Sequence, residues 1–205
     1  LLFMSSLIIN NIYDCKIDRL NKKPNTMTIK GASLKIHFTV FLLTVLYTLI
    51  LALSLGVKTL AICAAIHALS VFYSMPLVRL KRLFIINTSA IALATILAFY
   101  LGFSVSQQQN SGVFPLKWTL IVFAGLTLAF NVKDINDFRG DKQYGISTIM
   151  TVFGRKKGRI ITAFCAFSGY LLVTLIFPAN SVVFASLVAG VATFFTILVS
   201  KHKIN

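Results

Sequence analysis

The sequence predicts an all-α fold, a polytopic transmembrane helical bundle. Hydrophobic residues make up 57% of the 205-residue chain and charged residues only 12%, whereas a soluble domain carries about 25% charged residues. Several apolar stretches without an acidic residue also approach the roughly 20 residues that a membrane-spanning helix needs. Because so few charged side chains cannot cover a water-facing surface, we expect the lipid bilayer to be the solvent of this protein.

Six stretches are long enough to cross a bilayer as helices, the element expected because lipid offers no hydrogen-bond partner to a free backbone group. They cover residues 36–57, 59–78, 83–103, 113–130, 160–178 and 181–200. The fourth reaches this length only if Lys117 extends its ammonium group to the membrane surface. Residues 1–13 have the composition of the end of a further span, and we expect the chain to be a fragment.

Positive charge gathers on one side of the predicted bundle. All Lys and Arg residues except Lys58 and Lys117 fall in alternate loops, which comprise residues 14–35, 79–82, 133–159 and 201–205. Positively charged residues accumulate in cytoplasmic loops, so these loops are predicted to be cytoplasmic. The same distribution accounts for the net charge of +15 without a nucleic-acid partner.

The acidic residues occupy two short windows. The chain has five aspartates and no glutamate, and they are Asp14, Asp18, Asp134, Asp137 and Asp141. Both windows open loops on the predicted cytoplasmic side, so they can converge in space. Spacings of three and four residues place side chains on one face of a helix, and Asn10 extends the first window by the same spacing.

Clustered carboxylates predict a cation site. Like charges four residues apart destabilise an isolated helix by a few tenths of a kcal/mol, and a divalent cation offsets that repulsion. Mg²⁺ prefers carboxylate oxygens together with substrate phosphates, so two such faces suit a metal-bound diphosphate. The alternative is that the aspartates pair with nearby Lys and Arg as solvated loop charge.

Three motifs resemble those of the UbiA-type intramembrane prenyltransferase family. Residues 10–18 read NNIYDCKID and are similar to its first motif, NDxxDxxxD, with Asn11 in place of an Asp. Residues 133–148 read KDINDFRGDKQYGIST and resemble its second motif, KDxxDxxGDxxxGxxT. Residues 73–81 read YSMPLVRLK, similar to the family's YSxPxxRLK segment. After the first motif the chain departs from the family's NKPNRP pattern, which leaves the subfamily open.

The resemblance implies one domain over residues 1–205, with about seven of nine helices present around a central cavity and truncated at the N-terminus and, we expect, at the C-terminus. It implies an integral membrane enzyme that transfers a polyprenyl group from an allylic diphosphate to a lipid-soluble acceptor, with Mg²⁺ as cofactor. An aromatic quinone precursor is the expected acceptor. A prenylated glycerol phosphate, as in ether-lipid synthesis, is an alternative. A membrane cation transporter is the non-enzymatic alternative, although transporters place their sites near the bilayer midplane.

The resemblance also assigns roles to residues. Asn10, Asp14 and Asp18 are expected to hold one metal ion and Asp137 and Asp141 a second, with Asp134 in support. Tyr73 is expected near the reacting carbon, where its ring can stabilise a cation; an interfacial anchor is the alternative. The candidate diphosphate contacts are Arg79, Lys133, Lys142, Lys81 and Lys22. His67, inside a span, is a candidate functional group or a histidine hydrogen-bonded to a neighbouring helix.

Overall fold

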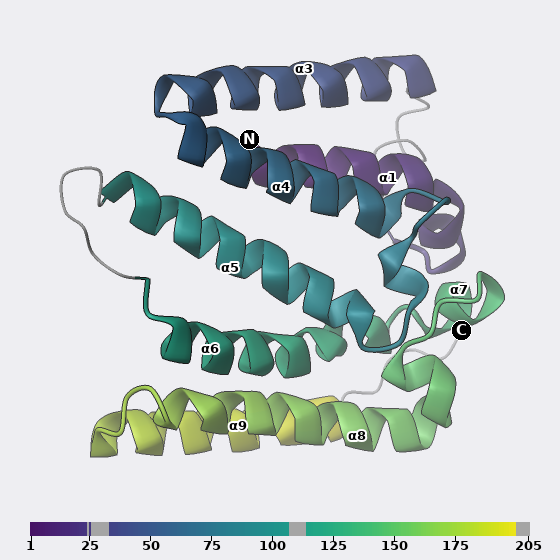
Figure 1. The fold of residues 1–205 in the computed structure, drawn as a ribbon. Helices are drawn as coiled ribbons and strands as arrows, with labels where there is room; N and C mark the ends of the chain where they lie inside the picture. Colours follow the sequence, from purple (N-terminus) through teal and green to yellow (C-terminus); the bar gives the residue numbers. More distant parts are fainter. Residues whose placement is uncertain (24, 26–32, 107–113, 200–205) are drawn as a thin grey trace. The chain divides into compact units, whose positions relative to one another are not determined.

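Helices form every regular element in the part of the chain that the structure describes. The structure is a computed structural model that describes residues 1–23, 25, 33–106 and 114–199 (Figure 1). The chain divides into two compact units, one formed by Leu1–Leu80 with Ala94–Phe114 and the other by Lys81–Leu93 with Pro115–Asn205. The prediction of a single domain stays a prediction. The predicted loops 14–35 and 201–205 lie partly and wholly outside the described residues, respectively.

The first unit is built on three helices that pack against one another, α1 (Leu2–Leu20), α3 (Leu34–Ser54) and α4 (Val57–Ser74) (Figure 1). Polar side chains join α1 to α4 within the apolar interface. The Nδ1 atom of His67 lies 3.1 Å from the hydroxyl oxygen of Ser5, and the Ser6 and Ser70 hydroxyl groups lie 2.7 Å apart. Hydrogen bonds of this kind hold helices together in lipid. The hydrophobic effect contributes little there, because lipid tails are as apolar as the side chains of a neighbouring helix. His67 therefore is bonded to a neighbouring helix, as one of the two interpretations predicted.

The second unit is arranged around α8 (Ile149–Thr174). This helix packs against α6 (Leu116–Ala129), α9 (Asn180–Val199) and the 3₁₀ helix η2 (Phe130–Ile135), and it also contacts the short helix α7 (Phe138–Gln143). Helix α5 (Ile86–Ser106) begins in this unit and continues into the first. The buried core of the second unit consists of Ile135, Met150, Ala163, Ala166 and Ile197.

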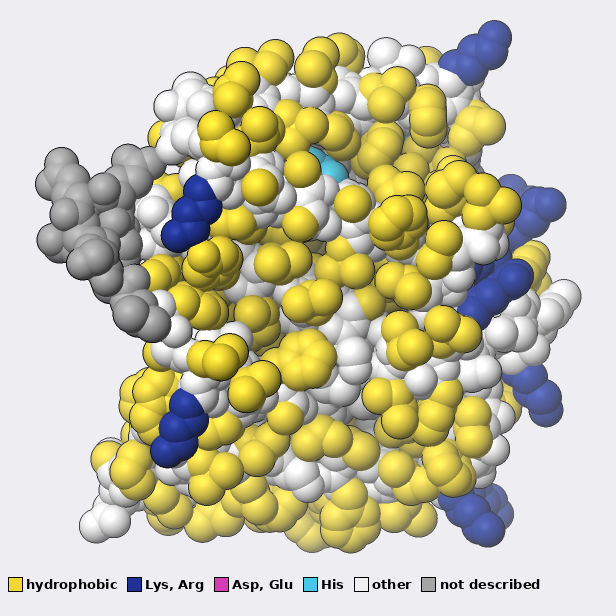
Figure 2. Space-filling view, viewed as in Figure 1, with side chains coloured by type: hydrophobic (Ala, Val, Ile, Leu, Met, Phe, Trp, Pro, Cys, Tyr) yellow, Lys and Arg dark blue, Asp and Glu magenta, His cyan; other side chains and the backbone are white. Residues whose placement is uncertain are grey.

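Among the residues that the structure describes, five helical segments are long and apolar enough to cross a membrane. They are Leu34–Ser54, Val57–Ser74, Ile86–Ser106, Leu116–Ile135 and Asn180–Val199. Large apolar side chains also remain exposed on them, with Leu43 60% and Phe184 71% exposed, and hydrophobic atoms cover most of the face shown in Figure 2. Soluble proteins rarely expose apolar patches of this size, whereas lipid requires them. The prediction of a multi-pass, all-helical membrane protein is confirmed.

Several boundaries differ from the prediction, those of α4 and α8 among them. Helix α4 ends at Ser74 rather than near residue 78, because Pro76 forces Met75 into an extended conformation with φ −65° and ψ 133°. The predicted span 160–178 is the second part of the longer helix α8, which has a kink at Gly154 (φ 76°). The basic residues before residue 160 are therefore helical, although apolar composition alone did not include them.

Candidate metal and diphosphate site

The first aspartate cluster lies on one continuous helix, as its spacing predicts. Helix α1 carries Asn10, Asp14 and Asp18. Asp14 is buried and Asp18 is partly buried. The hydroxyl group of Ser74, the last residue of α4, donates to the Asn10 side-chain oxygen over 3.4 Å. The end of α4 therefore lies beside this cluster.

Arg79 is the cation partner of the first cluster. Its guanidinium group lies 3.6 Å from an Asp14 carboxylate oxygen, and both side chains are largely buried. The Arg79 backbone has a φ of 44°, a left-handed conformation that is uncommon for a residue other than glycine. Such a conformation persists only where the surroundings impose it. The sequence predicted a functional cation here, and the structure pairs that cation with an aspartate.

Asn25 is a residue of this cluster that the sequence analysis missed. It is 1% exposed, and its amide nitrogen donates to the Asp18 carboxylate over 2.7 Å and to the Asn11 backbone oxygen over 3.2 Å. The amide thereby fixes the orientation of the Asp18 side chain. The signal was available, because Asn25 belongs to the loop that departs from the family's NKPNRP pattern.

The second cluster brings three aspartates together. Ligand oxygens of Asp134, Asp137 and Asp141 all lie within 4.8 Å of one another. Asp137, at the N-cap position of α7, and Asp141 are joined by a helical backbone hydrogen bond as their spacing predicts, whereas Asp134 belongs to the preceding η2, so the three do not share one continuous helix. The turn between the two short helices brings the carboxylates together instead. Oxygen donors at this separation suit a hard divalent cation such as Mg²⁺.

The electrostatics of the second cluster reflect crowded, buried charge. Burial raises the pKa of the Asp141 carboxyl to about 7, and the neighbouring Asp137 and Asp134 carboxylates add to the increase. Burial also lowers the pKa of the Lys81 ammonium to about 7, an effect that the Asp141 carboxylate opposes. A bound group of opposite charge would favour the ionised form of each. Burial therefore disfavours the ionised forms of both Asp141 and Lys81.

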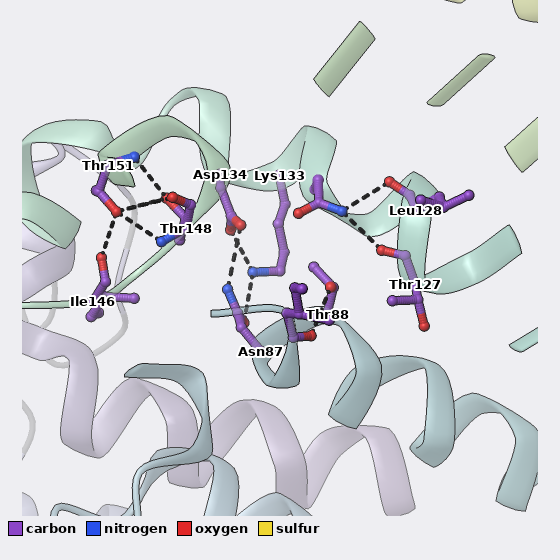
Figure 3. A network of polar contacts seen from close by, with 11 residues as sticks. Asn87, Thr88, Thr127, Leu128, Lys133, Asp134, Ile146, Thr148 and Thr151 are labelled. Atoms are coloured by element: carbon purple, nitrogen blue, oxygen red, sulfur yellow. Dashed lines mark hydrogen bonds and ion pairs between the residues drawn. The ribbon is translucent and has the colours of Figure 1, made fainter. Parts of the chain in front are cut away.

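Lys133 and Asp134 form a direct ion pair within this cluster. The amide of Asn87, at the start of α5, contacts both of them (Figure 3). Asn87 carried no role in the sequence analysis, because an asparagine near a helix start is most simply explained as a capping or turn residue.

The remaining predicted residues lie in less enclosed surroundings. Lys142 is exposed and its ammonium group lies 5.8 Å from the centre of the Phe138 ring. Lys22 is exposed, with a φ of 54°. Tyr73 is partly buried in the last turn of α4. The roles of these three residues stay predictions.

Part of the second motif shapes the backbone rather than the chemistry. Gly145 has a φ of 65°, which a residue without a Cβ atom adopts at little cost. Thr148 begins α8 with a capping box, in which Thr148 and Thr151 each accept a hydrogen bond from the other's backbone nitrogen (Figure 3). Gly145 and Thr148 direct the chain from α7 into α8. The second motif therefore combines aspartates for binding with residues that shape the turn.

Comparison with known proteins supports the assignment of the motifs. The model of the UbiA prenyltransferase family matches residues 1–204. The chain is 28% identical to digeranylgeranylglyceryl phosphate synthase of Sulfolobus acidocaldarius over 156 residues, which are 75% of this chain and 54% of the relative. The corresponding enzyme of Thermococcus gammatolerans is 32% identical over 161 residues, 76% of this chain and 54% of the relative.

A plant relative has a different acceptor in its name. The chloroplastic homogentisate solanesyltransferase of Arabidopsis thaliana is 28% identical over 181 residues, which are 82% of this chain and 44% of the relative. The chain thus spans about half the length of these relatives. No solved structure matches it. Because the family model covers nearly every residue, the chain belongs to the UbiA prenyltransferase family.

Proposed function

We propose that the protein transfers a polyprenyl group from an allylic prenyl diphosphate to a lipid-soluble acceptor in a magnesium-dependent reaction. One observation carries this proposal: a chain of the UbiA family holds all its aspartates in two clusters, each with a buried basic side chain beside it. Carboxylates suit the metal and the basic groups suit the diphosphate.

Each cluster has a role in metal binding in this proposal. Asn10, Asp14 and Asp18 hold one Mg²⁺, and Asp137 and Asp141 hold another, with Asp134 in support. The bound metal supplies electrostatic stabilisation to the negative charge of the departing diphosphate. The oxygen-only donor set of the second cluster fits this metal, because its three carboxylates lie close enough to share a small ion.

Basic side chains orient the diphosphate and stabilise its developing charge. Arg79 and Lys81 are the best candidates because both are buried, and they are two residues apart in the chain. Arg79 pairs with Asp14 of the first cluster, and the Asp141 carboxylate of the second cluster acts on Lys81, so each of the two basic side chains is a candidate contact for the diphosphate. Lys133 is the next candidate, followed by Lys142 and Lys22.

The reacting carbon needs protection once the allylic C–O bond breaks. The Tyr73 ring is proposed to lie near this carbon, where its π face stabilises a carbocation until the acceptor attacks. Apolar side chains keep water from the carbocation. The proposal places the aspartate motifs on the cytoplasmic side, which agrees with the distribution of Lys and Arg along the chain.

Two acceptors follow from the relatives. Several similar proteins are named digeranylgeranylglyceryl phosphate synthase, which favours a prenylated glycerol phosphate. Others are named homogentisate phytyl-, solanesyl- or geranylgeranyltransferase, which favours an aromatic quinone precursor. Our proposal keeps the aromatic acceptor first, with the glycerol phosphate as the second candidate.

A transfer assay tests the proposal. Membranes that contain the full-length protein are incubated with labelled farnesyl or geranylgeranyl diphosphate, Mg²⁺ and either homogentisate or geranylgeranylglyceryl phosphate. We expect label to enter one acceptor only when Mg²⁺ is present. Absence of both transfer and diphosphate release, alongside an active enzyme of the same family, would contradict the proposal.

Variants of the aspartates extend the assay. Asp14→Ala and Asp137→Ala are each expected to abolish turnover, because each removes a direct metal ligand. Asp134→Ala is expected to retain some activity, because its role is supporting. Membrane insertion of each variant, measured by alkaline extraction, should match that of the wild-type protein. Full activity of Asp137→Ala would contradict the assigned role of the second cluster.

A further inference from the structure

Asn87 occupies an unusual place beside the second aspartate cluster. It is 3% exposed and is the second residue of α5. Its amide nitrogen donates to the Asp134 carboxylate over 3.3 Å, and its amide oxygen accepts from the Lys133 ammonium group over 3.2 Å (Figure 3). One amide therefore contacts both members of the Lys133–Asp134 ion pair.

The chemistry of the three groups selects an amide for this position. An ionised carboxylate only accepts hydrogen bonds, an ammonium group only donates them, and an amide does both. Exchanging the amide nitrogen and oxygen of Asn87 would direct its oxygen at the Asp134 carboxylate and its NH₂ group at the Lys133 ammonium, which is unfavourable at both ends. The two partners thus fix the orientation of the Asn87 side chain, and the Asn87 amide in turn fixes theirs.

The backbone before Asn87 is held in a costly conformation. The Ile86 backbone nitrogen donates to the Phe84 oxygen over 2.8 Å, around Ile85 with a φ of 67°. A three-residue turn of this kind is rare and strained, and a positive φ is exceptional for a β-branched residue. Strain at this level is maintained only where surrounding contacts impose it, and the Asn87 contacts lie two residues further along the chain.

A second contact holds the same segment to the second motif. The Ser147 backbone nitrogen donates to the Arg82 oxygen over 3.1 Å. Ser147 directly precedes Thr148, which caps α8. The segment before α5 is therefore bound at one point to the end of the second motif and, through Asn87, at another point to its beginning.

We propose that Asn87 is a positioning residue that sets the orientation of the Asp134 carboxylate and keeps the Lys133 ammonium group beside it. This inference rests on the proposed function, since it assigns Asn87 to the metal site of the second cluster. Asn87 acts through Asp134 and does not itself contact the metal. Asp134 has one oxygen bonded to Lys133 and the other to Asn87, which agrees with a supporting rather than a direct ligand role.

Binding of Mn²⁺ to the purified full-length protein, measured by electron paramagnetic resonance, tests this inference without an activity readout. Asn87→Ala is expected to weaken Mn²⁺ binding about ten- to a hundredfold, the usual effect of removing a group that orients a metal ligand. Asn87→Leu, which is similar in size and apolar, provides a second variant if Asn87→Ala folds poorly, and the same weakening is expected.

Asn131 offers a matched control. It is also buried in this unit, and its amide nitrogen donates to the backbone oxygens of Thr127 and Leu128. Asn131→Ala removes a buried amide without touching the Asn87–Lys133–Asp134 contacts. Its Mn²⁺ affinity is expected to stay within about twofold of wild type, since it orients no ligand of the cluster.

A double variant separates positioning from general stability. If Asn87 acts through Asp134, Asn87→Ala added to Asp134→Ala should cause no further loss of Mn²⁺ affinity. Wild-type affinity in both Asn87 variants, or an equal loss with and without Asp134, would overturn the inference while leaving the proposed function intact. Failure of the wild-type protein to bind Mn²⁺ would overturn both together.

Discussion

The side chains that contact the aspartates of the first cluster have two different roles, charge compensation and orientation. Asp14 and Asp18 are four residues apart on α1, but each has its own partner, Arg79 for the first and Asn25 for the second. An arginine compensates charge, whereas an amide directs a carboxylate without neutralising it. The two aspartates are therefore not equivalent, although their spacing in the sequence gives no reason to distinguish them.

The Asn25 contact leads to a prediction about metal dependence. Asn25→Ala removes the 2.7 Å hydrogen bond to Asp18, and a hydrogen bond to a charged group contributes about 1.5–3 kcal/mol. We expect the Mg²⁺ concentration for half-maximal transfer to rise about tenfold or more. In an Asp18→Ala background, where Mn²⁺ binding replaces transfer as the readout, the same substitution should change nothing further. An unchanged Mg²⁺ requirement in Asn25→Ala would show that Asp18 needs no such support.

At the scale of elements, the kinked helix α8 explains why a basic run contains two glycines. A Cβ atom on Gly158 would lie 2.9 Å from the Ile149 backbone oxygen and 2.9 Å from the Met150 Cα atom. The first turn of α8 therefore packs directly on the backbone at Gly158, beyond the kink at Gly154. This close approach places the start of α8, and with it the end of the second motif, against the body of the helix.

The matched pair Gly158→Ala and Gly102→Ala tests this packing. A Cβ atom on Gly158 meets backbone atoms that cannot move aside, whereas one on Gly102 meets nothing within 4 Å. We expect Gly158→Ala to lower the thermal unfolding temperature in detergent, with a cost of about 1–3 kcal/mol typical of overpacking. Gly102→Ala should be neutral or slightly stabilising, because alanine favours a helix interior over glycine. Equal stability of the two variants would contradict the close approach.

Much of the site could be predicted from the sequence, and the reasons for the rest are local. The spacing of Asn10, Asp14 and Asp18 suffices because α1 is one regular helix. In the second cluster the spacing suffices for Asp137 and Asp141, but Asp134 lies across a break, in η2 rather than α7. Helical periodicity carries no information about a turn of that kind.

Residues that act by hydrogen bonding were the least predictable. Asn25 and Asn87 are buried amides that orient aspartates, yet an asparagine in a loop or near a helix start usually indicates only a turn or a cap. Most helix ends were predicted to within a few residues, but α8 begins at Ile149 rather than near residue 160, and α1 continues to Leu20 rather than ending near residue 13. Apolar composition measures the length of a hydrophobic run and not the point at which the helix stops.

At the scale of the whole molecule, the distribution of charge predicts one orientation in the membrane. Lys157 lies in a predicted cytoplasmic loop segment and Lys58 on the opposite side, and both are exposed. In a background without the natural cysteines, Lys157→Cys should react with a membrane-impermeant maleimide only after the cells are permeabilised. Lys58→Cys should react in intact cells. The reverse pattern would place the aspartate motifs outside.

We propose that each aspartate cluster contributes to the binding of a metal-bound prenyl diphosphate. Equilibrium binding of labelled farnesyl thiodiphosphate, a slowly reacting analogue, to the full-length protein in Mg²⁺ tests it directly. We predict that Asp14→Ala and Asp137→Ala each weaken binding about tenfold or more, and that removing Mg²⁺ gives a similar loss in the wild-type protein. Binding of the analogue at wild-type affinity by either variant would contradict the claim.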